Sequence, residues 1–195
     1  MNIITYTTLY AIGSINEIKS FKKSLPIEDN FFDFKKIIPI PFELEGIYVK
    51  SSKEELRKLN DWRRDNWGTP GEGFVEKISE IYSRNEMALE IELSTPYGEP
   101  VYIIDKITTE NSNLHFFVHH ISCFGDEHIG FKSKEDKKIN LICETVYDDH
   151  YEEQSYSIHQ ESLIGLQKSN IGYFQWEFLH NKNIGNHIIE NLQNI

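Results

Sequence analysis

A charged helical run ends abruptly within residues 61–74, and an extended run begins there. Trp62 and Trp67 bracket the end of the helical run. Glycine and proline then follow within a few positions, at Gly68, Pro70, Gly71 and Gly73. Glycine permits backbone conformations that a side chain disfavours, and proline fixes one torsion angle. The stretch therefore predicts a structural corner, with Trp67 buried against the preceding helix and Gly68 in a conformation that suits glycine.

Hydrophobic periodicity predicts strands and helices on both sides of this corner. Apolar and polar residues alternate strictly over residues 86–95, which is typical of a half-buried strand. Such a strand needs a neighbour, so we expect residues 74–82 to pair with residues 87–95 as an antiparallel hairpin. The other expected elements are a strand at 2–12, a helix from a capping box at Ser14 to about Leu25, a helix from a second capping box at Ser52, a helix after Pro100 and a strand at 114–121.

This order of elements predicts an α+β fold. We expect a ferredoxin-like two-layer sandwich, in which an antiparallel sheet carries its helices on one face, with two extra strands within residues 128–147. Two prolines keep residues 31–42 out of a central strand, so this segment is placed along an edge. The expected domains are residues 1–153, which hold the α+β domain with an inserted helix, and residues 154–195, a C-terminal helical and aromatic extension packed on it.

Composition narrows the functional classes. The 195 residues carry a formal charge of −11, which disfavours direct binding to nucleic acid or to an anionic membrane. Cys123 and Cys143 form no recognised pair, and the N-terminus has no secretory signal. No stretch is apolar enough to span a membrane. We expect a cytoplasmic protein without a cofactor, and the oligomeric state is left open.

Three blocks of sequence resemble phage and plasmid proteins that carry the YubB-type ferredoxin-like domain, an Api-like family of unknown function. The blocks are residues 32–39, the Asn66-Trp67-Gly68-Thr69 corner, and Thr95-Pro96 with Pro100. The chain departs from the family at residues 70–72, where a lysine and a tryptophan are usual, and at Tyr97, where a tryptophan is expected. The resemblance covers roughly residues 30–125 and implies a ferredoxin-like fold and a mobile-element origin. It implies no particular activity.

Histidines are the obvious catalytic candidates, namely His115, His119, His120, His128 and His150. On a strand, His115 and His119 share one face about 13 Å apart at ~3.3 Å per residue, which is too far for one metal ion. The alternative is a group of His120, Asp126 and His128 around a turn. Because no recognised metal-binding spacing is present, ordinary hydrogen-bonded histidines are favoured and no metal is predicted.

Two further groups of charged residues have simpler interpretations. Glu90 and Glu92 are interpreted as the solvated side of a sheet rather than as paired glycosidase carboxylates. The basic residues of the 53–67 helix alternate with acids, which favours a solvated helix face over a nucleic-acid patch. These basic residues are Arg57, Lys58, Arg63 and Arg64.

The strongest acidic segment lies at residues 144–153, where five acids occur without a lysine or arginine. A solvated loop is the simpler interpretation, and contact with a basic surface of a host protein is the sharper one. The residues of this binding hypothesis are Asp148, Asp149, Tyr151, Glu152 and Glu153, together with Trp62 and Trp67.

Two functional classes follow. The first is a non-enzymatic phage or plasmid protein that binds a host protein, as an anti-defence or regulatory factor. The second is an enzyme whose site is assembled from dispersed His, Asp and Glu residues. A concave pocket with convergent polar groups and perturbed acids favours the second class, whereas a flat acidic face favours the first.

Overall fold

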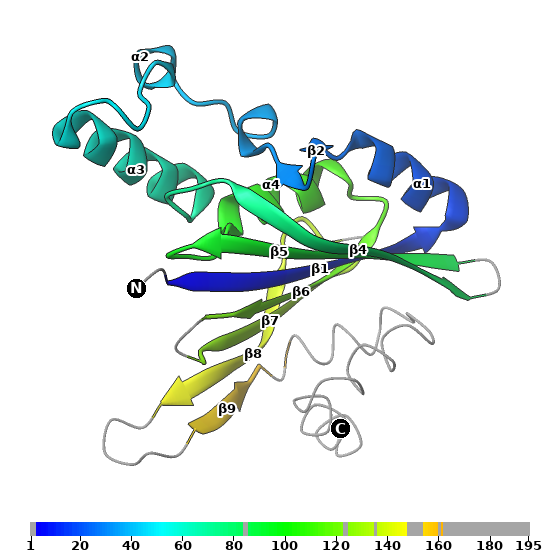
Figure 1. Cartoon of the computed structure of the whole chain (residues 1–195). Helices are drawn as coiled ribbons and strands as arrows, with labels where there is room; N and C mark the ends of the chain where they lie inside the picture. The colour runs from blue at the N-terminus through cyan, green and yellow to red at the C-terminus, as the bar shows by residue number, and fades with distance from the viewer. Residues whose placement is uncertain are drawn as a thin grey trace.

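A computed structural model describes residues 3–83, 86–122, 125–134, 136–147, 154–159 and 161 (Figure 1). Over these residues the chain forms one nine-stranded sheet in the order β2-β3-β4-β5-β1-β6-β7-β8-β9, and each neighbouring pair is antiparallel. The helices lie on one side of the sheet (Figure 1). The structure is thus α+β and compatible with a two-layer sandwich. None of its described helices has the length and apolarity needed to cross a membrane.

The centre of the sheet is β1 (Ile4–Ser14), which pairs with β5 (Glu86–Pro96) on one side and with β6 (His115–Ile121) on the other. β4 (Gly73–Ser83) pairs with β5, which confirms the predicted hairpin. α1 (Ile15–Ser24) follows β1 and begins with the predicted capping box at Ser14. α4 (Val101–Glu110) connects β5 to β6.

An insertion between α1 and β4 forms one edge of the sheet and an extra helical layer. β2 (Ile27–Glu28) and β3 (Phe31–Phe32) add to β4, which confirms the edge position expected for the start of the 31–42 segment. A 3₁₀ turn, η1 (Phe34–Lys36), and a short helix, α2 (Phe42–Glu45), complete that segment. α3 (Lys53–Trp67) follows and begins with the second predicted capping box, at Ser52.

The other edge of the sheet is longer than predicted. β7 (Glu127–Lys132) and β8 (Asn140–Tyr147) are the two extra strands expected from the sequence. β9 (Gln154–Ile158) then pairs with β8, so the sheet continues past the domain boundary predicted between residues 153 and 154. The helices expected further along the chain lie outside the described residues. β9 itself is short and polar, so its alternation is too weak to predict a strand from the sequence alone.

The corner at the end of α3 is part of the hydrophobic core. Trp67 is fully buried, and its Nε1 donates a hydrogen bond to the carbonyl oxygen of Ile38 at 3.0 Å. Its ring meets the rings of Phe34 and Trp62 edge to face, with centroids 5.7 and 5.8 Å away. Gly68 caps the helix with φ of +88°, in the left-handed region. Both features of the predicted corner are confirmed.

Buried apolar side chains occur on both faces of the sheet. The core under the helices includes Leu9, Ile91, Phe116 and Val118. Alternate positions of the same strands point to the opposite face, where further apolar residues are also buried. These are Ile12, Phe117, Ile129 and Phe131. The alternation of the strands had suggested a sheet with one solvent-exposed face. The structure instead buries apolar residues on both faces.

Candidate functional site

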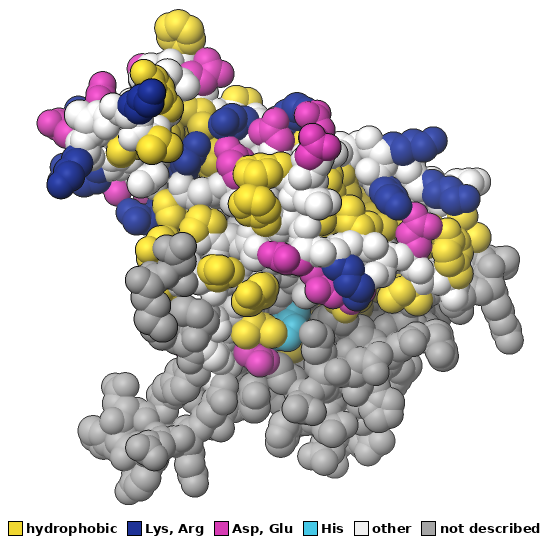
Figure 2. Space-filling model, in the orientation of Figure 1, with side chains coloured by type: hydrophobic (Ala, Val, Ile, Leu, Met, Phe, Trp, Pro, Cys, Tyr) yellow, Lys and Arg dark blue, Asp and Glu magenta, His cyan; other side chains and the backbone are white. Residues whose placement is uncertain are grey.

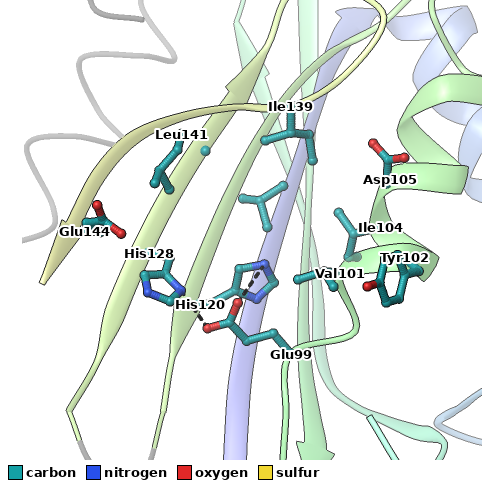
Figure 3. A pocket seen from close by; sticks show the side chains of 12 residues that line it. Glu99, Val101, Tyr102, Ile104, Asp105, His120, His128, Ile139, Leu141 and Glu144 are labelled. Atoms are coloured by element: carbon teal, nitrogen blue, oxygen red, sulfur yellow. Dashed lines mark hydrogen bonds and ion pairs between the residues drawn. The ribbon is translucent and has the colours of Figure 1, made fainter. Parts of the chain in front are cut away.

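A cavity of about 400 Å³ opens on the helix side of the sheet, where the first turn of α4 faces β6, β7 and β8 (Figure 3). Half of its lining is aliphatic or glycine, and the other half is polar or aromatic. The apolar lining residues are Val101, Ile104, Val118, Gly130, Ile139 and Leu141, and the others are Glu99, Tyr102, Asp105, His120, His128 and Glu144. A mostly apolar cavity of this size with a few convergent polar groups is typical of a small-molecule site.

Glu99 and two histidines form the polar centre of the cavity. Glu99 lies just before α4, and its Oε1 is 2.8 Å from Nδ1 of His128. The other carboxylate oxygen lies 4.0 Å from Nε2 of His120. The two histidines are register partners on β6 and β7, so neighbouring strands present both rings to one carboxylate (Figure 3).

His120 is held in place from the opposite side. Its Nδ1 lies 2.8 Å from the hydroxyl oxygen of Thr7 on β1, in a buried contact. Burial lowers the pKa of His120 to about 3, and the charges of His128 and His119 act in the same direction. His120 is therefore neutral near pH 7 and takes part as a hydrogen-bonding group rather than as a cation.

Glu99 is a carboxyl group in an apolar setting. Burial raises the pKa of Glu99, and the nearby charge of Asp126 adds to this effect, while the hydrogen bond from His128 opposes it. A raised pKa makes the carboxylate a stronger base and keeps the acid form accessible at higher pH. Together with the half-exposed ring of His128, this gives a carboxyl–imidazole pair that can pass a proton to or from a bound molecule.

The segment that carries Glu99 has a strained backbone. Tyr97 has φ of +58°, although it is not glycine, and its amide donates to the carbonyl oxygen of Ile3 at 2.9 Å. A bulky residue in this region costs about 1–3 kcal/mol and persists only where the surrounding structure imposes it. Such strain is concentrated at functional sites, and here it lies two residues before Glu99.

The corner at residues 66–71 packs against the segment that carries Glu99. The hydroxyl of Thr69 donates to the carbonyl oxygen of Pro96 at 2.7 Å. The backbones of Gly68 and Gly98 approach so closely that a Cβ on Gly98 would lie 2.5 Å from the oxygen of Gly68. A Cβ on Gly68 would lie 2.2 Å from the oxygen of Glu99. The segments 66–69 and 95–100 thus meet in space and position Glu99.

A second carboxylate faces the cavity from β8. Glu144 is the register partner of His128, and its Oε1 lies 3.3 Å from Nε2 of His159. In Figure 3 the ring of His128 lies between Glu144 and Glu99. Asp105 lines the cavity from α4, and its charge acts on the buried Lys132.

The residues of the binding hypothesis are not among the described residues that line this cavity. Trp67 is enclosed in the core, and Trp62 is half-buried against it, so these rings stabilise the corner. The other residues of the hypothesis lie outside the described residues, namely Asp148, Asp149, Tyr151, Glu152 and Glu153.

The predicted histidines separate into two groups. His120 and His128 come together, as one of the sequence alternatives predicted. Asp126 lies near enough for its charge to raise the pKa of Glu99, and it accepts a hydrogen bond from the hydroxyl of Ser122 at 3.0 Å. By strand alternation, His115 and His119 point away from the helices. His150 is not among the described residues. Within the described part of the chain, no cluster of three His, Cys, Asp or Glu side chains could hold a metal ion.

The other charged candidates form ion pairs. Glu90 and Glu92 both bind Lys77 at 3.0 Å. Glu92 is partly exposed to solvent as predicted, whereas Glu90 is largely buried and also accepts a hydrogen bond from the hydroxyl of Tyr10. On α3, Lys58 pairs with Glu54 at 3.0 Å and Arg64 with Asp61 at 3.1 Å. Arg63 instead turns inward, with its guanidinium 5.0 Å from the ring centre of Trp67 and its NH1 donating to the carbonyl oxygen of Pro70. Lys58 and Arg64 are thus paired with acids of the same helix.

Glu99 is the candidate site residue that the sequence did not reveal. One local signal was present: a single carboxyl between Gly98 and Pro100, immediately before a helix. This signal has no specificity, because acidic residues near helix N-termini are common. Glu99 becomes notable only through His128, which is 29 positions away.

A pH experiment tests the burial of His120. The folded-state pKa of about 3 lies below the usual value near 6.5, so between these pH values the unfolded chain binds a proton that the folded chain does not. The free energy of unfolding should therefore fall as the pH is lowered from 7 to 5, by up to about 1.4 kcal/mol per pH unit from His120. The raised pKa of Glu99 acts in the opposite direction.

Denaturant unfolding of the wild type and of His120→Asn at both pH values measures this contribution. The variant should show a flatter dependence on pH, whatever its absolute stability. An equal pH dependence in the two proteins would mean that His120 is not buried in its neutral form.

No protein-family model, curated protein or solved structure matches this chain.

Proposed function

We propose that the protein is an enzyme that binds a small, largely apolar molecule in the cavity beside α4 and transfers a proton with the Glu99–His128 pair. The observation that carries this proposal is the 2.8 Å contact between a desolvated carboxyl and an imidazole at a mostly apolar cavity of about 400 Å³. A concave pocket with a perturbed acid is the feature that distinguishes an enzyme from a protein with a flat acidic binding face.

The roles of the residues follow from their contacts. Glu99 is the general base, because burial raises its proton affinity, and His128 orients it and exchanges the proton with solvent. His120 is a positioning residue that Thr7 fixes in a neutral form beside Glu99. The aliphatic wall of α4, β6 and β8 binds the apolar part of the molecule and excludes water.

Proton abstraction can be tested with nitrobenzisoxazole, a neutral, flat aromatic probe. A base removes the carbon-bound proton of its ring, the electron pair forms a nitrile, and the N–O bond breaks to release a coloured phenolate. The wild type should accelerate this reaction, and Glu99→Gln should lose about 10²-fold or more of the acceleration. Absorbance of the phenolate gives the rate.

Glu110→Gln provides the matched control, because Glu110 is an exposed carboxylate at the other end of α4 that pairs with Lys106. This variant should retain the wild-type rate. If the wild type, Glu99→Gln and Glu110→Gln all gave the same rate, Glu99 would not be a base in this cavity.

We also propose a ferredoxin-like topology and a phage or plasmid origin for the chain. The strand order β4-β5-β1-β6, with α1 after β1 and α4 between β5 and β6, supports the topology. The proposed origin rests on the resemblance of the three sequence blocks to the YubB-type domain.

Binding to a basic host protein through residues 148–153 stays a prediction from the sequence, favoured by the formal charge of −11. Neutralising Asp148, Asp149, Glu152 and Glu153 should slow association with a captured partner and weaken its salt dependence. An unchanged association rate would contradict this second function.

A further inference from the structure

We propose that the molecule bound in the cavity is an amine, a protonated nitrogen on an apolar skeleton, and this inference rests on the proposed function of the cavity. The charged groups that line the cavity carry the argument. Glu99, Asp105 and Glu144 contribute three carboxyl groups, and among the described residues that line the cavity there is no lysine or arginine.

The three carboxyl groups are not equally free. Asp105 is attracted to Lys132, whose position on β7 places it next to the cavity wall. Glu99 and Glu144 have histidines as their nearest ionisable partners, at 2.8 and 3.3 Å. Among the described residues, Glu99 and Glu144 form ion pairs with histidines and with no lysine or arginine, so both carboxyl groups can accept hydrogen bonds from a cationic ligand.

The positions of Glu99 and Glu144 define one place for a cation. His128 contacts Glu99 directly and is the register partner of Glu144, so the two carboxylates flank the same ring from two sides (Figure 3). An ammonium group beside His128 therefore has a carboxylate acceptor on either side of the ring. Hydrogen bonds between charged partners in a partly desolvated site are stronger than neutral ones.

The remaining walls suit the rest of such a molecule. Val118, Ile104 and Leu141 form an aliphatic floor, and the half-exposed ring of Tyr102 stands at the rim. Aromatic rings attract cations as well as apolar groups. In Figure 2 the Lys and Arg side chains lie mainly over the helices, and the visible histidine has hydrophobic and acidic side chains beside it, with one Lys or Arg side chain next to these acids. An anionic ligand would be repelled by these carboxylates. A cation without an apolar skeleton would not contact the aliphatic residues of the cavity.

Three probes of the same shape separate the classes: benzylamine, benzyl alcohol and benzoate. Their binding to the full chain is measured by titration calorimetry at pH 7, with the NMR signals of His128 and Leu141 reporting the site. Benzylamine should bind about tenfold more tightly than benzyl alcohol, and benzoate more weakly than both. Glu144→Gln should remove most of the preference for the amine and leave the affinity for the alcohol unchanged, whereas Glu110→Gln should change neither.

The possible results distinguish the inference from the function on which it rests. Equal binding of amine and alcohol, or tighter binding of benzoate, would overturn the amine while leaving a ligand site and its proton-transfer rate intact. An unchanged amine preference in Glu144→Gln would also overturn it. If none of the probes shifts the signals of His128 and Leu141, and the elimination reaction also shows no dependence on Glu99, the cavity is not a ligand site and both proposals fail.

Discussion

Replacing Trp67 by alanine should lower the free energy of unfolding by about 3–5 kcal/mol. The side chain is fully buried at the point where α3, the 34–40 segment and the glycine-rich corner meet. Its removal eliminates edge-to-face contacts with Phe34 and Trp62 and leaves a large cavity. It also leaves the carbonyl oxygen of Ile38 without the indole donor. A partly buried carbonyl that loses its partner adds to the cost.

Denaturant unfolding measures this effect, and two variants calibrate it. Trp67→Phe keeps a ring but loses the indole N–H, so it should recover much of the stability without reaching the wild type. Tyr48→Ala removes an aromatic side chain that is 64% exposed and should change the free energy of unfolding by no more than about 0.5 kcal/mol. An effect of Trp67→Ala as small as that of Tyr48→Ala would mean that the tryptophan serves a partner rather than the core.

Replacing Gly68 by alanine should damage both the stability and the candidate site. The left-handed conformation, with φ of +88°, costs a residue with a side chain about 1–3 kcal/mol. The added Cβ would lie 2.2 Å from the oxygen of Glu99 and 2.9 Å from the nitrogen of Val101, both of which are backbone atoms. The segment before α4 must therefore move, and Glu99 moves away from His128.

Gly46→Ala is the matched control. Gly46 also follows the last residue of a helix, but its φ is −80° and a Cβ there meets no heavy atom within 4 Å. This variant should be neutral or slightly stabilised. We expect Gly68→Ala to lose stability and most of the Glu99-dependent elimination rate. If the folded Gly68→Ala protein eliminated nitrobenzisoxazole at the rate of Gly46→Ala, the corner would not position Glu99.

Local features of this protein were determined by the sequence itself. Both capping boxes, at Ser14 and Ser52, join groups three residues apart, so their hydrogen bonds need no tertiary context. The alternation over residues 86–95 expresses a period of two, which only a strand satisfies. The corner at Gly68 follows from the torsion angles that glycine alone adopts freely, and the structure has the same elements at these places.

The candidate site was decided by tertiary structure alone. Thr7 and His120 are 113 positions apart, and Glu99 and His128 are 29 positions apart. Periodicity states which face of a strand a residue occupies, but it does not state which strands are neighbours. The pairing of β6 with β7 and with β1 decides that His120 meets His128 and Thr7. The desolvation that raises the pKa of Glu99 likewise exists only after α4 has packed against the sheet, because burial depends on the complete fold rather than on neighbouring residues.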